Sequence, residues 1–355
     1  MAKLNLGVFF GGKSTEHEIS LISAKNIIDA ADKNKYNIIP VGIDKNGEFL
    51  FYNNQDYILD SHDAKKVHLG YGGLPITFSF GRDKELIGIF DKNLKIKIDV
   101  AFPVLHGSFG EDGTIQGLFE MANIPYVGAG VLGSVIGMNK DIAKKLLEKS
   151  GVKMAKFLVF DISEKGKIDF SYIISELKCP FFIKPTNSGS SVGVYKIKSE
   201  SEFREKTNEV FKFCDKIMCE EAIVGKEIEC SVLGNDNPAA SLPGEVITSH
   251  EFYSYDAKYL DENGAQLKIP ADLPEEATHK IQETAVKIFK LLNCTGMARV
   301  DGFLQENGDY IFSEINTIPG FTPISMYPKL WELNGISQTE LVSRLIQLAI
   351  DKNKF

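Results

Sequence analysis

Hydrophobic runs and helical periodicity alternate through the first third of the chain. The apolar run Leu4–Phe10 predicts a buried strand, and the apolar spacing over Ile19–Ala30 predicts a helix that follows a glycine turn. Thr15 and Glu18 match a capping box at the start of that helix. We therefore expect an open, mostly parallel α/β domain over residues 1–128. Its other expected elements are a strand ending at Ile43, a strand over 99–105, a helix over 114–123 and a short strand over 124–127.

The pattern changes after residue 128. A glycine-spaced linker leads into a lysine-rich helix over Asn139–Ser150, and Gly151 is placed to end it. We assign 129–221 to a central domain and 222–355 to a C-terminal domain, each mixing strands and helices. Their other expected elements are strands over 153–160, 180–184, 192–197 and 216–221, a helix near 199–213, and two terminal helices, one around Trp331 and one over 341–350.

One long segment, 249–268, shows no strong periodicity and is rich in Tyr, Asp and Lys. Loops of this length inside a compact domain are usually either disordered or functional lids. Its four aromatic residues favour a lid over disorder.

Two alternating segments near the C-terminus, 297–304 and 309–316, predict a β-hairpin. Asn307-Gly308 suits a two-residue turn with positive φ. A turn closed by these two residues sets the register of the hairpin. The expected facing pairs are Asp301 with Glu314, Arg299 with Asn316, and Phe303 with Phe312.

This register brings two carboxylates together. Side chains directly opposite each other on paired strands are only about 5 Å apart at Cβ, where like charges repel. A bridging cation removes that repulsion. Asp301, Glu314 and Asn316 offer hard oxygen ligands, which favours magnesium over zinc. The competing interpretation is an exposed strand face that carries ordinary acidic residues.

Composition limits the class of protein. A chain of 355 residues is long enough for two or three domains, and 43% hydrophobic with 25% charged residues is typical of a globular protein. The net charge of −8, with both signs interspersed, argues against nucleic-acid or anionic-membrane partners. We see no signal peptide or spanning segment, and five cysteines without a C-x-x-C pair suggest reduced thiols of a cytoplasmic protein.

A glycine- and serine-rich loop, Asn187–Gly193, follows the apolar strand that ends at Lys184. Its backbone N–H groups and hydroxyls could close over phosphate oxygens, and the lysine could neutralise them. The loop is not a Walker A motif, because no G-K-[ST] ends it and a strand follows. A plain hairpin turn is the alternative.

Several single residues allow two interpretations. Lys140 lies in the first turn of its helix, where a cation opposes the helix dipole, and either binds an anion or is one solvated lysine among several. Glu220 and Glu227 lie at the junction of the last two regions and could bind ribose hydroxyls or be ordinary surface acids. Glu16, beside a helix N-terminus, could pair a substrate ammonium or complement the dipole. His106 lies at the same edge of the sheet, where α/β proteins bind ligands.

The segment after the hairpin, Asn316–Gly320, turns sharply and exposes the Gly320 N–H. Together with Arg299 it could stabilise a developing oxyanion. A salt bridge from Arg299 to Glu314 is the competing account.

At this point the sequence closely resembles the D-alanine–D-alanine ligases of the ATP-grasp superfamily. The matching segments occur in the family's order along most of the chain. They are G-G-K-S-T-E-H-E-I-S (11–20), L-H-G-S-F-G-E-D-G-T-I-Q-G (105–117), M-N-K-D (138–141), F-I-K-P (182–185), G-S-S-V-G-V (189–194), F-Y-S-Y-D-A-K-Y (252–259), A-R-V-D (298–301) and E-I-N-T-I-P-G-F-T (314–322).

The resemblance implies an ATP-grasp fold in which an N-terminal α/β domain precedes two α+β domains that enclose ATP. It implies two magnesium ions, with manganese as a possible substitute, on Asp301, Glu314 and Asn316. The implied nucleotide-binding residues are Lys140, Lys184, Ser190, Ser191 and Lys258, with Glu220 and Ile223 at the adenine and Glu227 at the ribose.

The implied reaction joins two D-alanines for peptidoglycan precursor synthesis in the cytoplasm, through an acyl phosphate. Glu16 and His106 would bind the first D-alanine, Ser325 and Met326 the second. Arg299 and Gly320 would stabilise the tetrahedral intermediate.

Tyr259 is similar to the lid residue that marks dipeptide-forming members, and it would hydrogen-bond with Ser190 and Glu16. Depsipeptide-forming relatives generally carry histidine there, so tyrosine favours D-alanine over D-lactate as acceptor. Two rivals stay open: a related ligase with another acceptor, and a nucleotide-binding protein without ligase activity. The family also suggests a homodimer.

Overall fold

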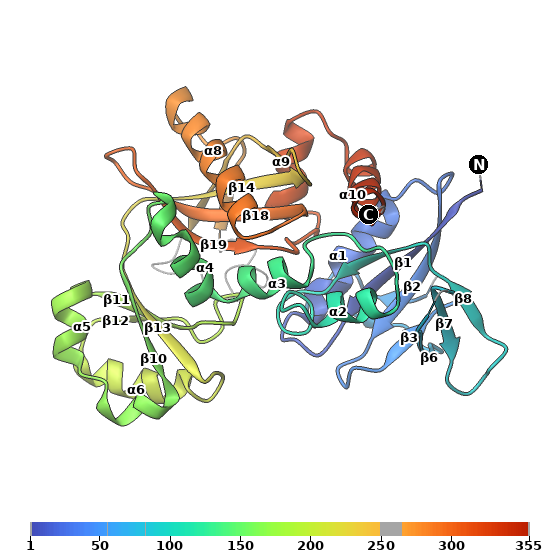
Figure 1. The fold of residues 1–355 in the computed structure, drawn as a ribbon, viewed down its shortest axis with the longest axis horizontal. Helices are drawn as coiled ribbons and strands as arrows, with labels where there is room; N and C mark the ends of the chain where they lie inside the picture. The colour runs from blue at the N-terminus through green and yellow to red at the C-terminus, as the bar shows by residue number, and fades with distance from the viewer. Residues whose placement is uncertain (1, 55, 82, 249–264, 354–355) are drawn as a thin grey trace.

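The computed structural model describes residues 2–54, 56–81, 83–248 and 265–353, which form three larger sheets and one two-stranded sheet. Figure 1 shows an N-terminal unit, a smaller unit from the middle of the chain, and a C-terminal unit between them. Within these described ranges, no helix has the length and apolar character needed to cross a membrane.

The N-terminal unit is built on a seven-stranded sheet. Its elements are β1 (Leu4–Gly11), α1 (His17–Ala30), β2 (Tyr36–Ile43), β3 (Phe49–Phe51), β4 (Ile58–Leu59), β5 (His68–Leu69), β6 (Leu74–Ser79), β7 (Glu85–Gly88), β8 (Lys95–Lys97), β9 (Val100–Val104) and α2 (Thr114–Met121). The strand order is β8-β7-β6-β3-β2-β1-β9. β2, β1 and β9 are parallel, as expected, whereas the sheet continues from β2 through β8 by antiparallel pairs that the sequence analysis did not predict.

The start of α1 differs from the prediction. Glu16 occupies the N-cap position, and its side chain makes no capping hydrogen bond. Glu18 instead accepts a hydrogen bond from Lys45 Nζ at 2.6 Å. The predicted Thr15–Glu18 capping box is therefore wrong, because the N-cap is Glu16, one residue after Thr15.

The middle of the chain forms a four-stranded antiparallel sheet in the order β10-β13-β11-β12, with two helices packed on it (Figure 1). The elements from residue 131 to 221 are α3 (Val131–Met138), α4 (Lys140–Leu147), η1 (Glu148–Ser150), β10 (Phe157–Asp161), η2 (Ile162–Lys167), α5 (Phe170–Leu177), β11 (Phe181–Pro185), β12 (Tyr195–Ile197), α6 (Glu200–Val210) and β13 (Lys216–Glu221). Asn139 caps α4 by accepting from Ile142 N–H at 3.1 Å, and Gly151 ends η1 at φ +79°.

The C-terminal unit is a six-stranded antiparallel sheet. Its elements are β14 (Lys226–Gly234), β15 (Ala239–Ala240), β16 (Gly244–Thr248), β17 (Ala265–Lys268), α8 (Glu275–Leu291), β18 (Gly296–Leu304), β19 (Tyr310–Asn316), α9 (Met326–Leu333) and α10 (Gln338–Lys352). The strand β17 occupies the last four residues of the segment predicted as a lid. The rest of that segment, 249–264, lies outside the described residues.

The β18–β19 hairpin has the predicted register where it matters for the carboxylates. Arg299 faces Asn316, and Asp301 faces Glu314. The register shifts by one residue between Asp301 and Gly302, which marks a β-bulge.

The turn of this hairpin differs from the prediction. Gln305 N–H donates to the Asp309 carbonyl at 2.9 Å, so the loop is one residue longer than the predicted two-residue turn. Phe303 consequently pairs with Ile311, and the predicted pairing with Phe312 is wrong. The bulge then restores the predicted register at the carboxylates.

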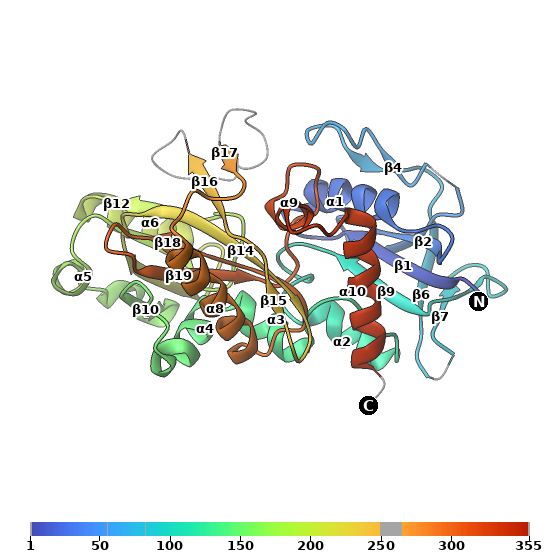
Figure 2. The ribbon, with the colours of Figure 1, turned by 90° about the horizontal axis from the view of Figure 1, so that it is seen from above.

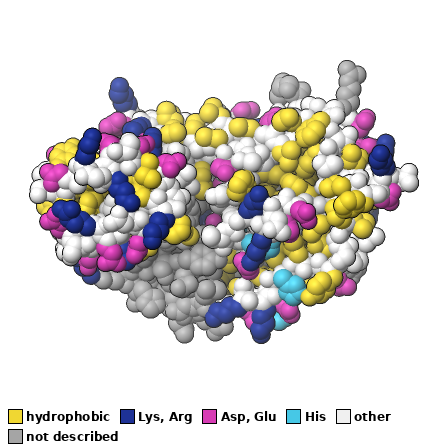
Figure 3. All heavy atoms as spheres, turned by 90° about the horizontal axis from the view of Figure 1, so that it is seen from below, with side chains coloured by type: hydrophobic (Ala, Val, Ile, Leu, Met, Phe, Trp, Pro, Cys, Tyr) yellow, Lys and Arg dark blue, Asp and Glu magenta, His cyan; other side chains and the backbone are white. Residues whose placement is uncertain are grey.

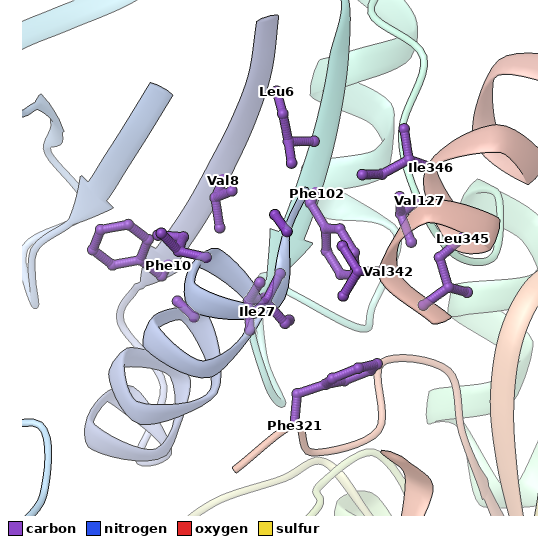
Figure 4. Close-up of a cluster of buried hydrophobic side chains, with 14 of the residues drawn as sticks. Leu6, Val8, Phe10, Ile27, Phe102, Val127, Phe321, Val342, Leu345 and Ile346 are labelled. Atoms are coloured by element: carbon purple, nitrogen blue, oxygen red, sulfur yellow. The ribbon is translucent and has the colours of Figure 1, made fainter. Parts of the chain in front are cut away.

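The largest hydrophobic core joins the two ends of the chain. Figure 4 shows Leu6 and Phe102 of the N-terminal sheet beside Val342 and Leu345 of α10. In Figure 2, α10 lies across the N-terminal unit beside α1. The C-terminal helix therefore covers a face of the N-terminal sheet.

Candidate active site

A cavity of about 1050 Å³ lies between the four-stranded sheet and the C-terminal sheet. β11 and β13 supply one wall, and β16 and the β18–β19 hairpin supply the other. The predicted residues that line it are Lys140, Lys184, Ser191, Glu220, Ile223, Glu227 and Glu314.

A buried charge cluster forms part of the first wall. Lys184 Nζ donates to Glu220 Oε2 at 2.5 Å, and Lys144 Nζ lies 2.6 Å from Glu220 Oε1. Burial alone would raise the pKa of Glu220, but the two ammonium groups outweigh it and lower the pKa to about 2. Glu220 is thus a carboxylate held between two cations. Lys144 received no role from the sequence, and its side chain has 0% exposure.

Lys140 connects the two walls. Its Nζ lies 3.1 Å from Glu314 Oε2 on β19 and donates to the Ser188 carbonyl at 2.8 Å. The residue is buried, which excludes the alternative of a solvated surface lysine. One ammonium group therefore ties the glycine- and serine-rich loop to the carboxylate hairpin.

That loop also reaches the N-terminal unit. Ser190 has φ +51° and Ser191 φ +58°, a left-handed conformation that side chains rarely adopt. The Ser190 hydroxyl donates to Glu16 Oε1, and Glu16 is buried at the start of α1. All three units consequently meet around Glu16 and Lys140.

Asp301 on the β18–β19 hairpin is paired with a cationic side chain of the same strand. Arg299 Nε and Nη2 donate to the two oxygens of Asp301 at 2.8 and 2.7 Å, and Asn316 Nδ2 donates to Asp301 Oδ2 at 2.8 Å. Arg299 Nε also lies 3.0 Å from Glu229 Oε2 on β14. Sequence reasoning missed Glu229, because local sequence does not show which side chains of the neighbouring strand a glutamate will face.

The donor set suits a divalent cation. Asp301 and Glu314 lie on adjacent strands with Asn316 beside them, and all three offer hard oxygen ligands. Among the residues that the structure describes, no group of three His, Cys, Asp or Glu side chains could hold a metal ion, so the amide of Asn316 is needed to complete this set.

A second carboxylate, Glu111, holds the segment after the hairpin. It accepts from Gly107 N–H at 2.9 Å and from Ile318 N–H at 3.0 Å. Burial, together with the nearby carboxylates of Glu16 and Glu314, raises the pKa of Glu111 to about 7. Glu111 received no role from the sequence.

His106 binds the same segment. Its Nδ1 donates to the Ile318 carbonyl at 3.0 Å, and its Nε2 lies 3.3 Å from Ser23 Oγ. Burial lowers the pKa of His106, which favours the neutral ring. Ser23 Oγ in turn accepts from Phe321 N–H at 3.3 Å. The N-terminal unit therefore fixes the backbone on both sides of Gly320.

The role of the two residues expected at the second substrate stays a prediction, and the structure gives their local contacts. Ser325 Oγ accepts from Thr322 N–H at 2.9 Å, which closes a turn just after Gly320. Met326 is buried against Val246 and Leu330. Tyr259 and Lys258 lie outside the described residues.

A cavity enclosed by two α+β units, with lysines and a glycine- and serine-rich loop on one wall and paired carboxylates on the other, defines a protein of the ATP-grasp class. The family model described as D-ala D-ala ligase N-terminus matches residues 5–129, and the one described as D-ala D-ala ligase C-terminus matches 146–347. The chain belongs to the D-alanine–D-alanine ligase family, which confirms the resemblance noted from its motifs.

Curated relatives and solved structures agree with this assignment. The chain is 48% identical to a D-alanine–D-alanine ligase of Shouchella clausii, with 100% of this chain and 96% of the relative covered. It superposes on the ligase structure from Coxiella burnetii with a TM-score of 0.88 at 38% identity, covering 100% of this chain and 96% of that one. It also superposes on the VanG D-Ala:D-Ser ligase of Enterococcus faecalis with a TM-score of 0.86 at 36% identity, covering 98% and 100%.

A structure with bound nucleotide is also similar. The Bacillus anthracis D-alanine–D-alanine ligase complexed with ATP superposes with a TM-score of 0.74 at 26% identity, and 99% of each chain is covered. This supports the use of ATP by the family to which the chain belongs.

Proposed function

We propose that this protein joins two molecules of D-alanine to D-alanyl-D-alanine at the expense of ATP, as a step in peptidoglycan precursor synthesis. The observation that carries the proposal is that Lys140 contacts both the Ser188 carbonyl in the glycine- and serine-rich loop and the carboxylate of Glu314. A γ-phosphoryl group held between these elements would lie beside the amino-acid site at Glu16. Names of full-length relatives at 44–49% identity support the choice of substrate.

In this reaction the first D-alanine carboxylate attacks the γ-phosphorus of ATP and releases ADP. The amine of the second D-alanine then attacks the acyl phosphate carbon, and inorganic phosphate and a proton leave. Lys140 and Lys184 would bind the phosphates under the loop of Ser190 and Ser191. Arg299 and the Gly320 N–H would stabilise the tetrahedral oxyanion.

The remaining roles are those that the resemblance to the family implies. Asp301, Glu314 and Asn316 would hold two Mg²⁺ ions, with Mn²⁺ able to replace them; bound metal would neutralise the transferring phosphoryl group. Other proposed contacts are Glu16 and His106 with the first D-alanine, Ser325 and Met326 with the second, Ile223 and Glu220 with adenine, Glu227 with ribose, Lys258 with ATP, and Tyr259 with Ser190 and Glu16.

The acceptor is the open part of this proposal, because a similar structure is named a D-Ala:D-Ser ligase. The test is incubation with ATP, magnesium and D-alanine, alone and with D-serine or D-lactate, followed by product identification by mass. We expect D-alanyl-D-alanine to dominate at neutral pH. A dominant D-alanyl-D-lactate or D-alanyl-D-serine product would overturn the acceptor, and no D-alanine-dependent phosphate release would overturn the ligase.

The metal site gives a direct prediction. Glu314→Gln removes one carboxylate of the facing pair and should lower kcat at least about a hundredfold, since a ligand of the metal ion that would neutralise the phosphoryl group is lost. The fold should persist, because Glu314 is not in the hydrophobic core. Steady-state phosphate release and circular dichroism measure both. Glu332→Gln on α9, an exposed acid, is the control, and near-normal turnover of Glu314→Gln would remove Glu314 from the metal site.

We also propose a cytoplasmic homodimer. Figure 3 shows hydrophobic side chains gathered on the N-terminal unit. The large apolar side chains exposed on this unit include Tyr71, Phe80, Phe90, Phe109 and Met121. Sedimentation equilibrium at micromolar concentration tests the dimer, and a single monomeric species would overturn it.

A further inference from the structure

A buried lysine behind the cavity wall has no role in the reaction described so far. Lys144 on α4 has 0% exposure, and its Nζ lies 2.6 Å from Glu220 Oε1. The same Nζ lies 5.7 Å from the ring centre of Phe157 and 5.8 Å from that of Phe312. Burying an ammonium group is costly unless an anion and aromatic faces compensate it. An apolar side chain would pack here at lower cost, so the charge itself needs an explanation.

The charge has one partner in common with the nucleotide site. This shared partner is Glu220, because Lys144 Nζ lies 2.6 Å from its Oε1 and Lys184 Nζ donates to its Oε2 at 2.5 Å. Lys184 lines the cavity, whereas Lys144 has no exposed surface. Of the two lysines, Lys184 is thus the one whose ammonium can turn to a ligand.

We propose that Lys144 is a positioning residue for the nucleotide, because it keeps Glu220 neutralised and so allows Lys184 to exchange this carboxylate for a phosphate. In the absence of Lys144, movement of Lys184 from Glu220 to a phosphate would leave the buried carboxylate of Glu220 without either lysine. That state is strongly unfavourable. Lys184 would then stay on Glu220, and ATP would bind weakly. This inference rests on the proposed function, since it concerns the phosphates of the same nucleotide.

The test compares two adjacent lysines on α4. Lys144→Met removes the buried charge at similar length, and Lys145→Met removes an exposed lysine that pairs with Asp141 at 2.7 Å. We expect Lys144→Met to raise KM for ATP and the calorimetric Kd for ATP about tenfold. KM for D-alanine should change less than about twofold, because the amino-acid site at Glu16 is separate. Lys145→Met should match wild type in all three. Equal changes in both KM values, or none, would overturn the proposal.

A double-mutant cycle separates charge from packing. If Lys144 acts through the charge of Glu220, then Lys144→Met made in a Glu220→Gln background should change the Kd for ATP less than about twofold. A tenfold loss in both backgrounds would mean that Lys144 only fills space between two rings, and would overturn the proposal.

Two further outcomes are decisive. Should Lys144→Met fail to fold in a thermal melt, a folded, ATP-binding Lys144→Met/Glu220→Gln double variant would support the coupling, and an unfolded one would overturn it. The proposed function fails separately. A wild-type protein that binds ATP but forms no dipeptide would overturn the proposed ligase activity. The ATP-binding measurements on the Lys144 variants would still decide the role of Lys144.

Discussion

At the scale of single residues, the site consists of buried charges that are paired with side chains of opposite charge. Glu220 is held by Lys144 and Lys184, and Asp301 by Arg299. Glu111 differs, because the two groups it accepts from are backbone N–H groups, each without a full charge. Its carboxylate therefore gains less from its surroundings, and its pKa rises to about 7.

Glu111 should make stability depend on pH. Its pKa rises from 4.5 in a free side chain to about 7 in the fold, so the folded protein holds this proton more tightly. The resulting stabilisation is complete below pH 4.5 and is lost as the pH rises through 7. The free energy of unfolding of wild type relative to Glu111→Gln should fall by up to about 3 kcal/mol over this range. Urea titrations at several pH values measure it, and a difference that is constant with pH contradicts it.

Residue-level prediction located several motif residues correctly, while their chemical roles stay predictions. Lys140, Lys184 and the facing pair Asp301–Glu314 lie at the cavity or across the hairpin as the sequence indicated. Lys144 could not be assigned, because helical spacing does not tell which of several lysines faces inward until the partner at Glu220 is known.

At the scale of elements, the hairpin shows how two local errors can cancel. Asn307-Gly308 is a strong two-residue turn signal, yet the loop is closed by Gln305 and Asp309. The resulting shift of one residue is reversed by the bulge next to Asp301. A bulge of this kind depends on packing against neighbouring segments, which local sequence does not reveal.

The start of β18 depends on a close approach between two backbones. Gly296 has φ +74°, and a Cβ added there would lie 3.0 Å from Gly128 N. Gly296→Ala should therefore destabilise the protein by about 2–3 kcal/mol, through backbone strain plus contact. Gly151→Ala is the matched control, since Gly151 has φ +79° with no atom within 4 Å of an added Cβ. It should cost only about 1 kcal/mol. Denaturant unfolding compares the two, and equal losses would contradict the close approach.

At the scale of the whole molecule, the N-terminal and C-terminal parts of the chain share one core (Figures 2 and 4). The domain boundary expected at residue 128 remains a prediction. Periodicity identified the parallel strands of the first sheet and the last helix, but it could not show that they pack together. Local spacing along the sequence carries no information about contacts between residues as far apart as Leu6 and Leu345.

The shared core gives a prediction about stability. Leu345→Ala on α10 removes a side chain with 0% exposure that packs against the N-terminal sheet, and should lower the free energy of unfolding by about 2–5 kcal/mol. Leu333→Ala on α9, where the leucine is 43% exposed, should cost less than about 1 kcal/mol. Urea denaturation followed by circular dichroism measures both, and comparable losses would mean that α10 adds little.

The position of α10 also affects the order in which the protein matures. Synthesis proceeds from the N-terminus, so the first sheet leaves the ribosome long before residues 338–352 have been made. Until then the face that α10 covers is bare hydrophobic surface open to chaperones and to other nascent chains. The earliest part of this enzyme to be translated is thus among the last to reach its finished form.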